Sequence, residues 1–440
     1  MRRLVYASLG VFFLIGCGED NKECKIGAPD ACDNGQVCEA YTDMSGMHTA
    51  CFAPTVLRGK ITNAESGVPI PGARVVAIDG DSHASTGPVS ISDSAGNYSV
   101  RIIAPRAADA SKQYTLRVSA AGYNEFPSGI RIAIPITVSF AMPKDAAKVE
   151  GPQDVALTPI AAAPPGAIAG KVSGLQVAGV LVVAEAAGKG WSTVSDGGGD
   201  YVIFNVPDGT YTVRGYFIGV NYAPVAGVPV AGHRTDGVNL ASSGVAAGAL
   251  TGSLDYVAGA PSGVTTAVVL RLQSTREVPP GLSVPAGNGT YMLAKVPDGT
   301  YDVLAAFPTD GIVKDPDPGI AGTGTPTVTI AGATVDAGQF KVTAPVAMLH
   351  PDADERLGGT PSFTWTAYPS AQFYKIEVFD SQGNPIWMQN NVTGTSLSYA
   401  GPALIPGDFY QWRITSFRTT SMGAIPNSIS EDLRGVWQQM

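Results

Sequence analysis

Histidine and serine are the side chains that would most readily reveal catalytic chemistry, and their spacing does not favour it here. None of the four histidines lies in an H-E-x-x-H pair or begins an H-x-x-E pair, so the zinc sites of common metallopeptidases are not predicted. The sequence also lacks a G-x-S-x-G turn for a nucleophilic serine and a phosphate-binding P-loop. We therefore expect no catalytic residues, no cofactor and no resident metal ion.

The N-terminus carries a short apolar run, from Leu4 to Ile15, after two arginines. About a dozen residues are too few to span a bilayer, which needs about 20, but they suit a secretory signal peptide. The run ends in Leu14-Ile15-Gly16-Cys17, which resembles the lipobox of bacterial lipoproteins. The resemblance implies cleavage after residue 16 and acylation of Cys17, which would anchor the chain stably in a membrane. An ordinary signal peptide with an incidental cysteine is the alternative.

In bacterial lipoproteins, the residue after the lipidated cysteine decides whether the protein stays at the inner membrane or moves to the outer membrane. Gly18 lacks the acidic character that retains such proteins at the inner membrane, so the resemblance implies the outer membrane. The periplasmic side and the surface-facing side both stay open.

Four cysteines remain if Cys17 is lipidated. They lie in one short stretch that is rich in Gly and Asp, and no cysteine follows them. So small a segment buries little apolar surface, so two disulfides are expected to stabilise it. Four cysteines allow three pairings, and the sequence does not choose among them. A zinc site with His48 is the alternative, although the segment has no C-x-x-C pair. The four are Cys24, Cys32, Cys38 and Cys51.

Composition favours a chain of short strands and turns. Among 440 residues there are 53 Gly and 33 Pro, with 45% hydrophobic and 15% charged residues. Each Gly or Pro inside a helix costs about 1–3 kcal/mol relative to alanine, so long helices are disfavoured. The net charge of −9, without a cluster of Lys and Arg, argues against nucleic acid as a partner. The length predicts about three to five domains.

A repeated motif divides the middle of the chain. The residues V-P-D-G-T-Y at 206–211 recur unchanged at 296–301, and a Gly-aromatic turn precedes each copy. Alternating apolar and polar residues predict half-buried strands, so each copy should form a small antiparallel sandwich. In an earlier copy, Tyr114, Leu116 and Val118 share one face while Thr115, Arg117 and Ser119 share the other; Tyr211 and Val213 alternate in the same way with Thr212 and Arg214.

That earlier copy has the motif order G-K-I, P-G-A-R-V and D-S-A-G-N-Y within residues 59–98. The order resembles the carboxypeptidase regulatory-like domain, which implies a transthyretin-like or prealbumin-like β-sandwich of the carbohydrate-binding-like group. The resemblance is good over residues 55–142, weaker over 165–241 and weakest over 246–343. Peptidases that carry such domains use a zinc H-x-x-E pair, which no histidine here supplies, so the resemblance implies no peptidase activity.

A different pattern begins at Pro345, where aromatic residues become more frequent. The stretch L-I-P-G-D-F-Y-Q-W-R-I at 404–414 resembles L-x-P-G-x-x-Y-x-W-x-V of fibronectin type III domains. The resemblance implies that the Tyr410 hydroxyl bonds to nearby backbone and that Trp365 is a buried core residue.

The predicted fold class is all-β, with tandem antiparallel β-sandwiches, prealbumin-like and then immunoglobulin- or fibronectin-like, after a small disulfide-rich segment. The expected domains are a lipoprotein signal peptide (1–16), a lipidated tether and Cys-rich segment (17–54), three carboxypeptidase regulatory-like domains (55–143, 164–241 and a degenerate 246–343) and a fibronectin type III-like domain (345–437).

The leading functional hypothesis is a non-enzymatic cell-surface lipoprotein that presents its sandwiches for binding, adhesion or spacing in the envelope. A carbohydrate-binding protein for envelope or environmental polysaccharide is one alternative, and an accessory subunit of a secretion or peptidase complex is another. The membrane is the expected partner through the lipid anchor, with a carbohydrate or an envelope protein open as a further partner. Trp191, Tyr222 and Trp387 lie outside the clearest alternating runs and are the candidates for stacking on a sugar, although most large aromatics in sandwiches are core.

Overall fold

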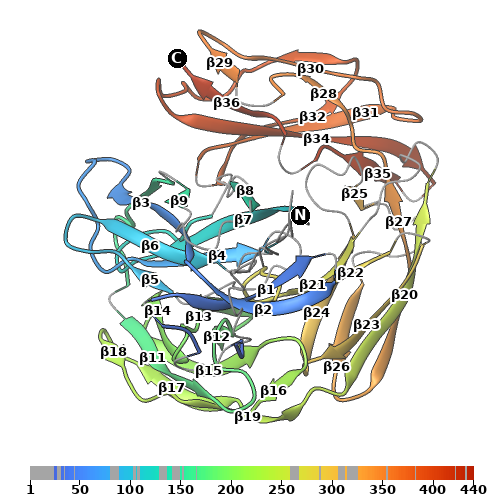
Figure 1. Ribbon diagram of the computed structural model, residues 1–440. Helices are drawn as coiled ribbons and strands as arrows, with labels where there is room; N and C mark the ends of the chain where they lie inside the picture. Colours follow the sequence, from blue (N-terminus) through green and yellow to red (C-terminus); the bar gives the residue numbers. More distant parts are fainter. Residues whose placement is uncertain are drawn as a thin grey trace, which may run out of the picture. The chain divides into compact units, whose positions relative to one another are not determined.

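The computed structural model shows a chain built from β-strands and turns (Figure 1). The residues it describes are 24–26, 31–33, 35–43, 45–79, 89–102, 106, 110–127, 136–140, 149–150, 153–164, 166–257, 267–286, 289–305, 313–314, 326–352, 355–381, 383–421, 423–431 and 434–440. Over these ranges no helix is long and apolar enough to cross a membrane. The chain divides into a small unit with the N-terminal cysteines and a large unit with the sandwiches. The all-β prediction is confirmed.

The first sandwich contains two sheets. Its core includes Leu57, Ile61 and Val100. It extends past residue 143, where we expected it to end, because a later strand pairs in parallel with its first strand. One sheet has the order β10 (Val155–Leu157), β3 (Thr55–Asn63), β6 (Asn97–Ile102), with β9 (Val149–Glu150) also on β3; the other has the order β5 (Ser90–Ile91), β4 (Arg74–Asp79), β7 (Ala110–Ser119), β8 (Ile136–Phe140).

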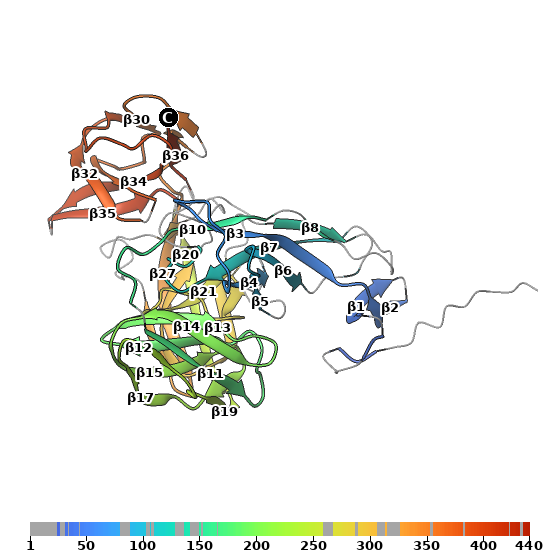
Figure 2. The ribbon, with the colours of Figure 1, turned by 90° about the vertical axis from the view of Figure 1, so that its left-hand side faces the viewer.

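The second sandwich repeats this plan, and Figure 2 shows its strands in green. Val182, Ile203 and Val213 lie in the core between its sheets. The first sheet has the order β14 (Asp200–Val206), β11 (Gly166–Ser173), β19 (Leu240–Val245), β16 (Val220–Tyr222), with β18 (Arg234–Thr235) also on β11; the second has the order β13 (Lys189–Val194), β12 (Leu181–Ala186), β15 (Gly209–Tyr216), β17 (Val225–Val230).

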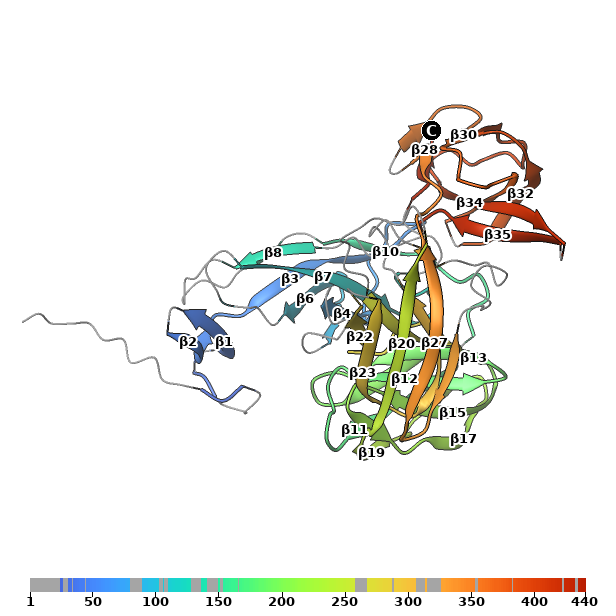
Figure 3. The same cartoon turned by 90° about the vertical axis from the view of Figure 1, so that its right-hand side faces the viewer.

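The third sandwich has the same two-sheet plan. Figure 3 shows its long strands β20 and β27 side by side, where they pair in parallel. One sheet has the order β23 (Thr290–Val296), β20 (Gly248–Tyr256), β27 (Thr334–Thr343), β25 (Val313–Lys314); the other has the order β22 (Ser283–Pro285), β21 (Ala267–Leu272), β24 (Gly299–Ala305), β26 (Thr327–Ile330).

The C-terminal sandwich packs its two sheets around Phe363, Trp412 and Trp437, which are fully buried. Trp365 is 2% exposed, as expected of a core residue, and the Tyr410 hydroxyl accepts a hydrogen bond from the Ile405 amide at 2.9 Å. One sheet has the order β28 (Met348–His350), β30 (Ser362–Trp365), β33 (Ser396–Ser398); the other has the order β29 (Glu355–Leu357), β36 (Val436–Gln439), β34 (Phe409–Thr420), β31 (Phe373–Phe379), β32 (Pro385–Val392), with β35 (Gly423–Ile429) also on β34.

One strand in each of the first three sandwiches is buried on both faces. Arg74–Ala77 in β4, Leu181–Ala184 in β12 and Val268–Leu270 in β21 are all buried, although side chains alternate between faces along a strand. An antiparallel sheet with one solvated face would leave every second residue exposed. The second face of these strands is therefore covered by a neighbouring sandwich.

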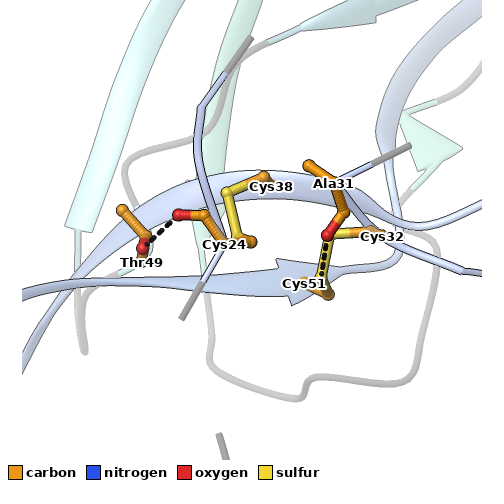
Figure 4. Close-up of a disulfide and its surroundings, with 6 residues drawn as sticks. All are labelled: Cys24, Ala31, Cys32, Cys38, Thr49 and Cys51. Atoms are coloured by element: carbon orange, nitrogen blue, oxygen red, sulfur yellow. Dashed lines mark hydrogen bonds between the residues drawn. A yellow bond between two sulfur atoms is a disulfide. The ribbon is translucent and has the colours of Figure 1, made fainter. Parts of the chain in front are cut away.

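The small unit is a hairpin, β1 (Val37–Asp43) and β2 (Gly46–Phe52), held by two disulfides. Cys24 pairs with Cys38, and Cys32 pairs with Cys51, which gives the pairing that the sequence left open (Figure 4). The Thr49 hydroxyl also donates a hydrogen bond to the Cys24 carbonyl at 2.6 Å. The disulfides thus tie the stretch before the hairpin to both of its strands.

A buried ion pair completes this unit. The Arg106 Nε atom lies 2.8 Å from the Glu39 carboxylate, and both side chains are almost fully buried. The Arg106 guanidinium also lies over the Phe52 ring, 4.8 Å from its centre. A unit with so little apolar core depends on such contacts and on its disulfides for stability.

Candidate functional site

Equivalent residues of the sequence repeat form the contact between the first and second sandwiches and the contact between the second and third. The Gly122 amide donates a hydrogen bond to the Asn205 side-chain oxygen at 2.8 Å, and the Gly219 amide donates one to the Lys295 carbonyl at 2.8 Å. Gly122 follows β7 and Gly219 follows β15, which hold the same place in the sheet order of their sandwiches, and both glycines have positive φ values, 82° and 83°. Asn205 and Lys295 each precede a V-P-D-G-T-Y motif in the next sandwich and also have positive φ. Consecutive sandwiches therefore dock through equivalent residues.

The two copies of this contact differ in the atoms that the residue with positive φ, Asn205 or Lys295, contributes. The Asn205 amide nitrogen donates to the carbonyls of Ala120 and Tyr123, at 3.2 and 2.9 Å, so the whole side chain is used. At Lys295 the contact uses the backbone carbonyl. Asparagine tolerates positive φ better than lysine does, so Asn205 combines the required backbone with a side chain that docks.

A continuous apolar core runs through the three sandwiches. Val76 of the first, Val183 and Val194 of the second and Leu270 of the third belong to one cluster of buried residues. The rings of Tyr216 and Tyr301 meet edge to face across the second junction, with centres 6.3 Å apart. A buried core shared in this way resists sliding of the sandwiches past one another.

A cleft with a volume of about 990 Å³ opens where the three sandwiches meet. That is near the upper end of the range of about 300–1,000 Å³ for small-molecule sites. Its walls come from β7 and the loop after it, from β13 and β14, and from the segment that follows β21. The polar and aromatic lining residues are Thr115, Arg117, Ser119, Tyr123, Asn124, Glu125, Trp191, Ser192, Phe204, Asn205, Thr275, Arg276 and Glu277.

Arg117 is the central polar residue of this cleft. Its guanidinium binds the carboxylate of Glu125, in its own sandwich, and that of Glu277, in the third. It also donates to the Ser192 hydroxyl of the second sandwich at 2.9 Å, and Ser192 in turn donates to Glu277. The Arg117 side chain is 12% exposed. One arginine therefore links all three sandwiches, with both carboxylates bound to a single cation.

Burial changes the proton affinities of this cluster. Loss of solvent around Glu125 raises its pKa to about 7; Arg117 opposes this shift and the nearby Glu277 charge adds to it. Burial alone would lower the pKa of Arg117, but the two carboxylates outweigh it and raise that pKa above its ordinary value. Glu125 is thus the group in the cleft whose charge changes near neutral pH.

Of the three aromatic residues predicted to stack on a sugar, Trp191 lines this cleft. It is half-buried on the edge strand β13, and Tyr211 holds it edge-on with ring centres 5.5 Å apart. Trp387 lies on the C-terminal sandwich, where its ring packs against Phe363 and Tyr399. Trp191 also packs against the core of the second sandwich, and of the three candidates it is the one that lines the cleft.

The prediction for Tyr222 was wrong. Its side chain is 8% exposed, its ring packs against the backbone of Gly215, and its hydroxyl donates to the Gln176 carbonyl at 2.8 Å. A Cβ atom at position 215 would lie 2.9 Å from the ring, so glycine is what makes room for it. Tyr222 is thus a core residue of the second sandwich with its hydroxyl satisfied, and no ligand could stack on it.

A second, smaller cleft of about 530 Å³ lies between the second and third sandwiches. Arg214 occupies the place in its sandwich that Arg117 has in the first, because each follows a Tyr-Thr pair and one apolar residue. The Arg214 Nε atom lies 3.2 Å from Glu185, which accepts a hydrogen bond from Ser274 of the third sandwich at 2.6 Å. The repeat thus places an arginine–glutamate pair at both junctions.

Sequence reasoning found the faces of these strands but not their role. It assigned Thr115, Arg117 and Ser119 to the face opposite the core, and the structure uses that face to line the cleft. The signal that could have revealed it is the continuous apolar run in β4, β12 and β21, since a strand buried on both faces needs a cover. Glu277 and Ser192 had no such signal, because each depends on a partner in another sandwich.

The lipidation site lies outside the described residues. Cys17 and residues 1–16 are not among the residues that the structure describes, so the anchor stays a prediction. Within the described residues, the one cluster with metal-ligand types is Cys24, Cys32 and Cys51, and all three are in disulfides. A sulfur bound in a disulfide is not the thiolate that binds zinc.

Comparison with known proteins gives one family match. No curated protein sequence matches the chain. Among solved structures it is similar to the Bacillus anthracis TIE protein, at 10% identity over 94% of this chain and 76% of that one, with a TM-score of 0.17. It is also similar to the minor pilin GBS52 of Streptococcus agalactiae (12% identity, 40% and 95% covered, TM-score 0.20) and to the major pilin subunit BcpA of Bacillus cereus (11%, 66% and 99%, 0.17). At these TM-scores the structural similarities carry no further argument. Residues 56–142 match the carboxypeptidase regulatory-like domain, which identifies the kind of domain that the first sandwich is.

Proposed function

We propose that this chain is a non-enzymatic, lipid-anchored envelope protein whose sandwiches form a rigid support for a binding surface. The observation that carries the proposal is the repeated junction, in which Gly122 meets Asn205 and Gly219 meets Lys295. Together with the shared core, this junction makes three sandwiches into one body with a fixed cleft. A preformed cleft binds its ligand without the entropic cost of assembling the site.

The polar groups of the cleft support binding rather than catalysis. The Glu125 and Glu277 carboxylates both bind Arg117, so neither is placed as an independent acid or base. The residues that line the cleft include no cysteine, histidine or lysine that could serve as a nucleophile or metal ligand. A raised pKa on its own is also found in structural ion pairs, so the Glu125 shift does not argue for an active site.

Export and anchoring are the part of the proposal that rests on the sequence. The resemblance of Leu14–Cys17 to a lipobox supports a lipid on Cys17, and the two disulfides of the small unit support an oxidising compartment. The proposed place is the outer membrane. The fibronectin type III resemblance of residues 345–437 and the regulatory-like character of the second and third sandwiches belong to this proposal as well.

The anchor is tested by metabolic labelling with a radioactive fatty acid in a bacterial host. We expect the wild-type chain to be labelled and to fractionate with the outer membrane, and Cys17→Ser to lose the label. Ser8→Ala, a change within the apolar run, is the matched control and should still be labelled. Normal processing of the wild type to a soluble, unlabelled protein would show that Cys17 is not an anchor.

Absence of catalysis is tested on the purified full chain with panels of peptide, ester and glycoside substrates. We expect no turnover above that of the Glu125→Gln, Glu277→Gln double variant. A hydrolytic activity that this double variant loses would overturn the non-enzymatic proposal and assign the two carboxylates a catalytic role.

A further inference from the structure

We propose that the cleft where the three sandwiches meet binds a neutral saccharide that stacks on Trp191. The inference rests on the proposed function, because it names the ligand class of the same cleft. No single sandwich holds the site. Its lining comes from Thr115 and Arg117 of the first, Trp191 of the second and Glu277 of the third.

Aromatic rings on two walls of the cleft provide stacking surfaces. Trp191 and Phe204 come from neighbouring strands of the second sandwich, and Tyr123 comes from the loop after β7 of the first. All three are half-buried and line the cleft, and Trp191 also packs against the core of the second sandwich. The C–H face of a pyranose packs well on such a ring, and the edge-on contact with Tyr211 fixes the orientation of Trp191 before any ligand arrives.

Short polar side chains also line the cleft. Thr115 and Ser119 carry hydroxyls on the face of β7 that lines the cleft, and Asn124 adds an amide. Hydroxyl and amide groups both donate and accept hydrogen bonds, which matches the hydroxyls of a sugar. A mixture of apolar rings with a few placed polar groups is the usual lining of a small-molecule site.

Charge decides between a neutral and an ionic saccharide. The ionisable lining residues are two cations, Arg117 and Arg276, and two carboxyl groups, Glu125 and Glu277, so the cleft carries little net charge near neutral pH, where Glu125 changes its charge. Arg117 already binds the carboxylates of Glu125 and Glu277. Neither carboxylate is therefore a strong partner for a charged ligand. An acidic polysaccharide would have to compete with Glu125 and Glu277 for Arg117 and would have Arg276 as its other cation. A neutral sugar needs no such exchange.

The proposal is tested with the lipid-anchored full chain, solubilised in detergent, on an array of neutral glucans, mannans, galactans and N-acetylated glycans with acidic polysaccharides beside them. We expect at least one neutral glycan to bind. Calorimetry then measures the affinity of the chain for that glycan. Trp191→Ala should weaken that binding by about fivefold to tenfold. Trp387→Ala removes the same side chain from the C-terminal sandwich and should leave the affinity unchanged.

A second variant guards against a folding defect in Trp191→Ala. Thr115→Val keeps the shape of a half-buried side chain and removes its hydroxyl, and we expect binding to weaken about threefold to tenfold with the thermal unfolding midpoint retained. No binding to any neutral glycan, binding to acidic glycans alone, or neutral binding that both variants leave intact would each overturn the inference. The fatty-acid label on Cys17 is independent of these outcomes, so the anchor proposal would survive their failure.

Discussion

The guanidinium of Arg117, on the first sandwich, binds the carboxylate of Glu277, on the third, with the Ser192 hydroxyl of the second sandwich bound to both. The whole second sandwich separates Arg117 from Glu277 in the sequence. The contact can form only when all three sandwiches are packed together, so it reports on their assembly. The Arg117 side chain is 12% exposed, and its loss would leave two half-buried carboxylates without their cation.

Arg117→Met should destabilise the large unit by about 3 kcal/mol, because it leaves the Glu125 and Glu277 carboxylates without their cation. The measurement is urea unfolding of the purified chain, followed by tryptophan fluorescence. The matched control is Arg234→Met, which breaks an ion pair with Asp236 in the second sandwich whose arginine side chain is 53% exposed. That change should cost less than about 1 kcal/mol. Equal effects of the two substitutions would show that Arg117 does not join the sandwiches.

Asn205 and Lys295 offer a paired test of the repeated junction, since both have positive φ and both precede V-P-D-G-T-Y. Glycine adopts positive φ without strain, so Lys295→Gly should be neutral or stabilise by up to about 1 kcal/mol. Asn205→Gly also relieves the backbone but loses the side-chain bonds to Ala120, Gly122 and Tyr123, and should destabilise by about 1–3 kcal/mol.

Thermal unfolding of both variants measures the difference. The prediction fails if Asn205→Gly is as stable as Lys295→Gly, because the side chain of Asn205 would then contribute nothing to docking.

Much of each sandwich could be predicted from local patterns, because its core comes from alternation within single strands. Tyr114, Leu116 and Val118 are buried as expected, and Trp365 and Tyr410 have the environments that their motif implied. Tyr222 could not be placed correctly, since β16 is a strand of three residues in which no alternation can be read. Its burial depends on Gly215, which pairs with a different strand.

The cleft itself was beyond sequence reasoning for a different reason. Its cluster joins residues 75 and 85 positions apart along the chain, Arg117 with Ser192 and Ser192 with Glu277, and no local pattern marks the partners. The sequence identified the polar, outward face of β7. Because a polar face is ordinarily solvated, it did not indicate that this face lines a cleft. The apolar runs of β4, β12 and β21, each buried on both faces, were the local signals that these strands are covered on both sides.

Reduction of the disulfides should unfold the small unit and leave the large unit intact. The bonds Cys24–Cys38 and Cys32–Cys51 span 14 and 19 residues, and each such loop closure stabilises by about 3 kcal/mol in the chain-entropy account. No cysteine follows Cys51, so the sandwiches contain no bond to reduce. Limited proteolysis with and without reductant should show new cleavage only in the small unit, before Pro54 and at Arg106. A reductant-dependent shift in the main thermal transition would contradict this prediction.

The Glu125 carboxyl should make stability fall as pH rises. Its pKa is raised from an ordinary value of 4.5 to about 7, so the folded protein binds this proton more tightly than the unfolded chain does. The stabilising contribution is complete below about pH 4.5 and is lost as pH rises through about 7. Glu125→Gln cannot lose the proton. The wild type should therefore lose on the order of 1 kcal/mol relative to this variant between about pH 5 and about pH 8.

Urea unfolding of both proteins across that range gives the difference directly, because every other titrating group is common to the two. Glu65→Gln is the matched control, since it makes the same substitution at an exposed loop position of the first sandwich. Its stability relative to the wild type should stay constant over the range. Arg117 faces Glu125 and Glu277 lies nearby, so Arg117→Met should change the size of the Glu125→Gln trend. A Glu125→Gln difference that stays flat, or that grows in favour of the wild type with rising pH, would show that Glu125 is ionised throughout.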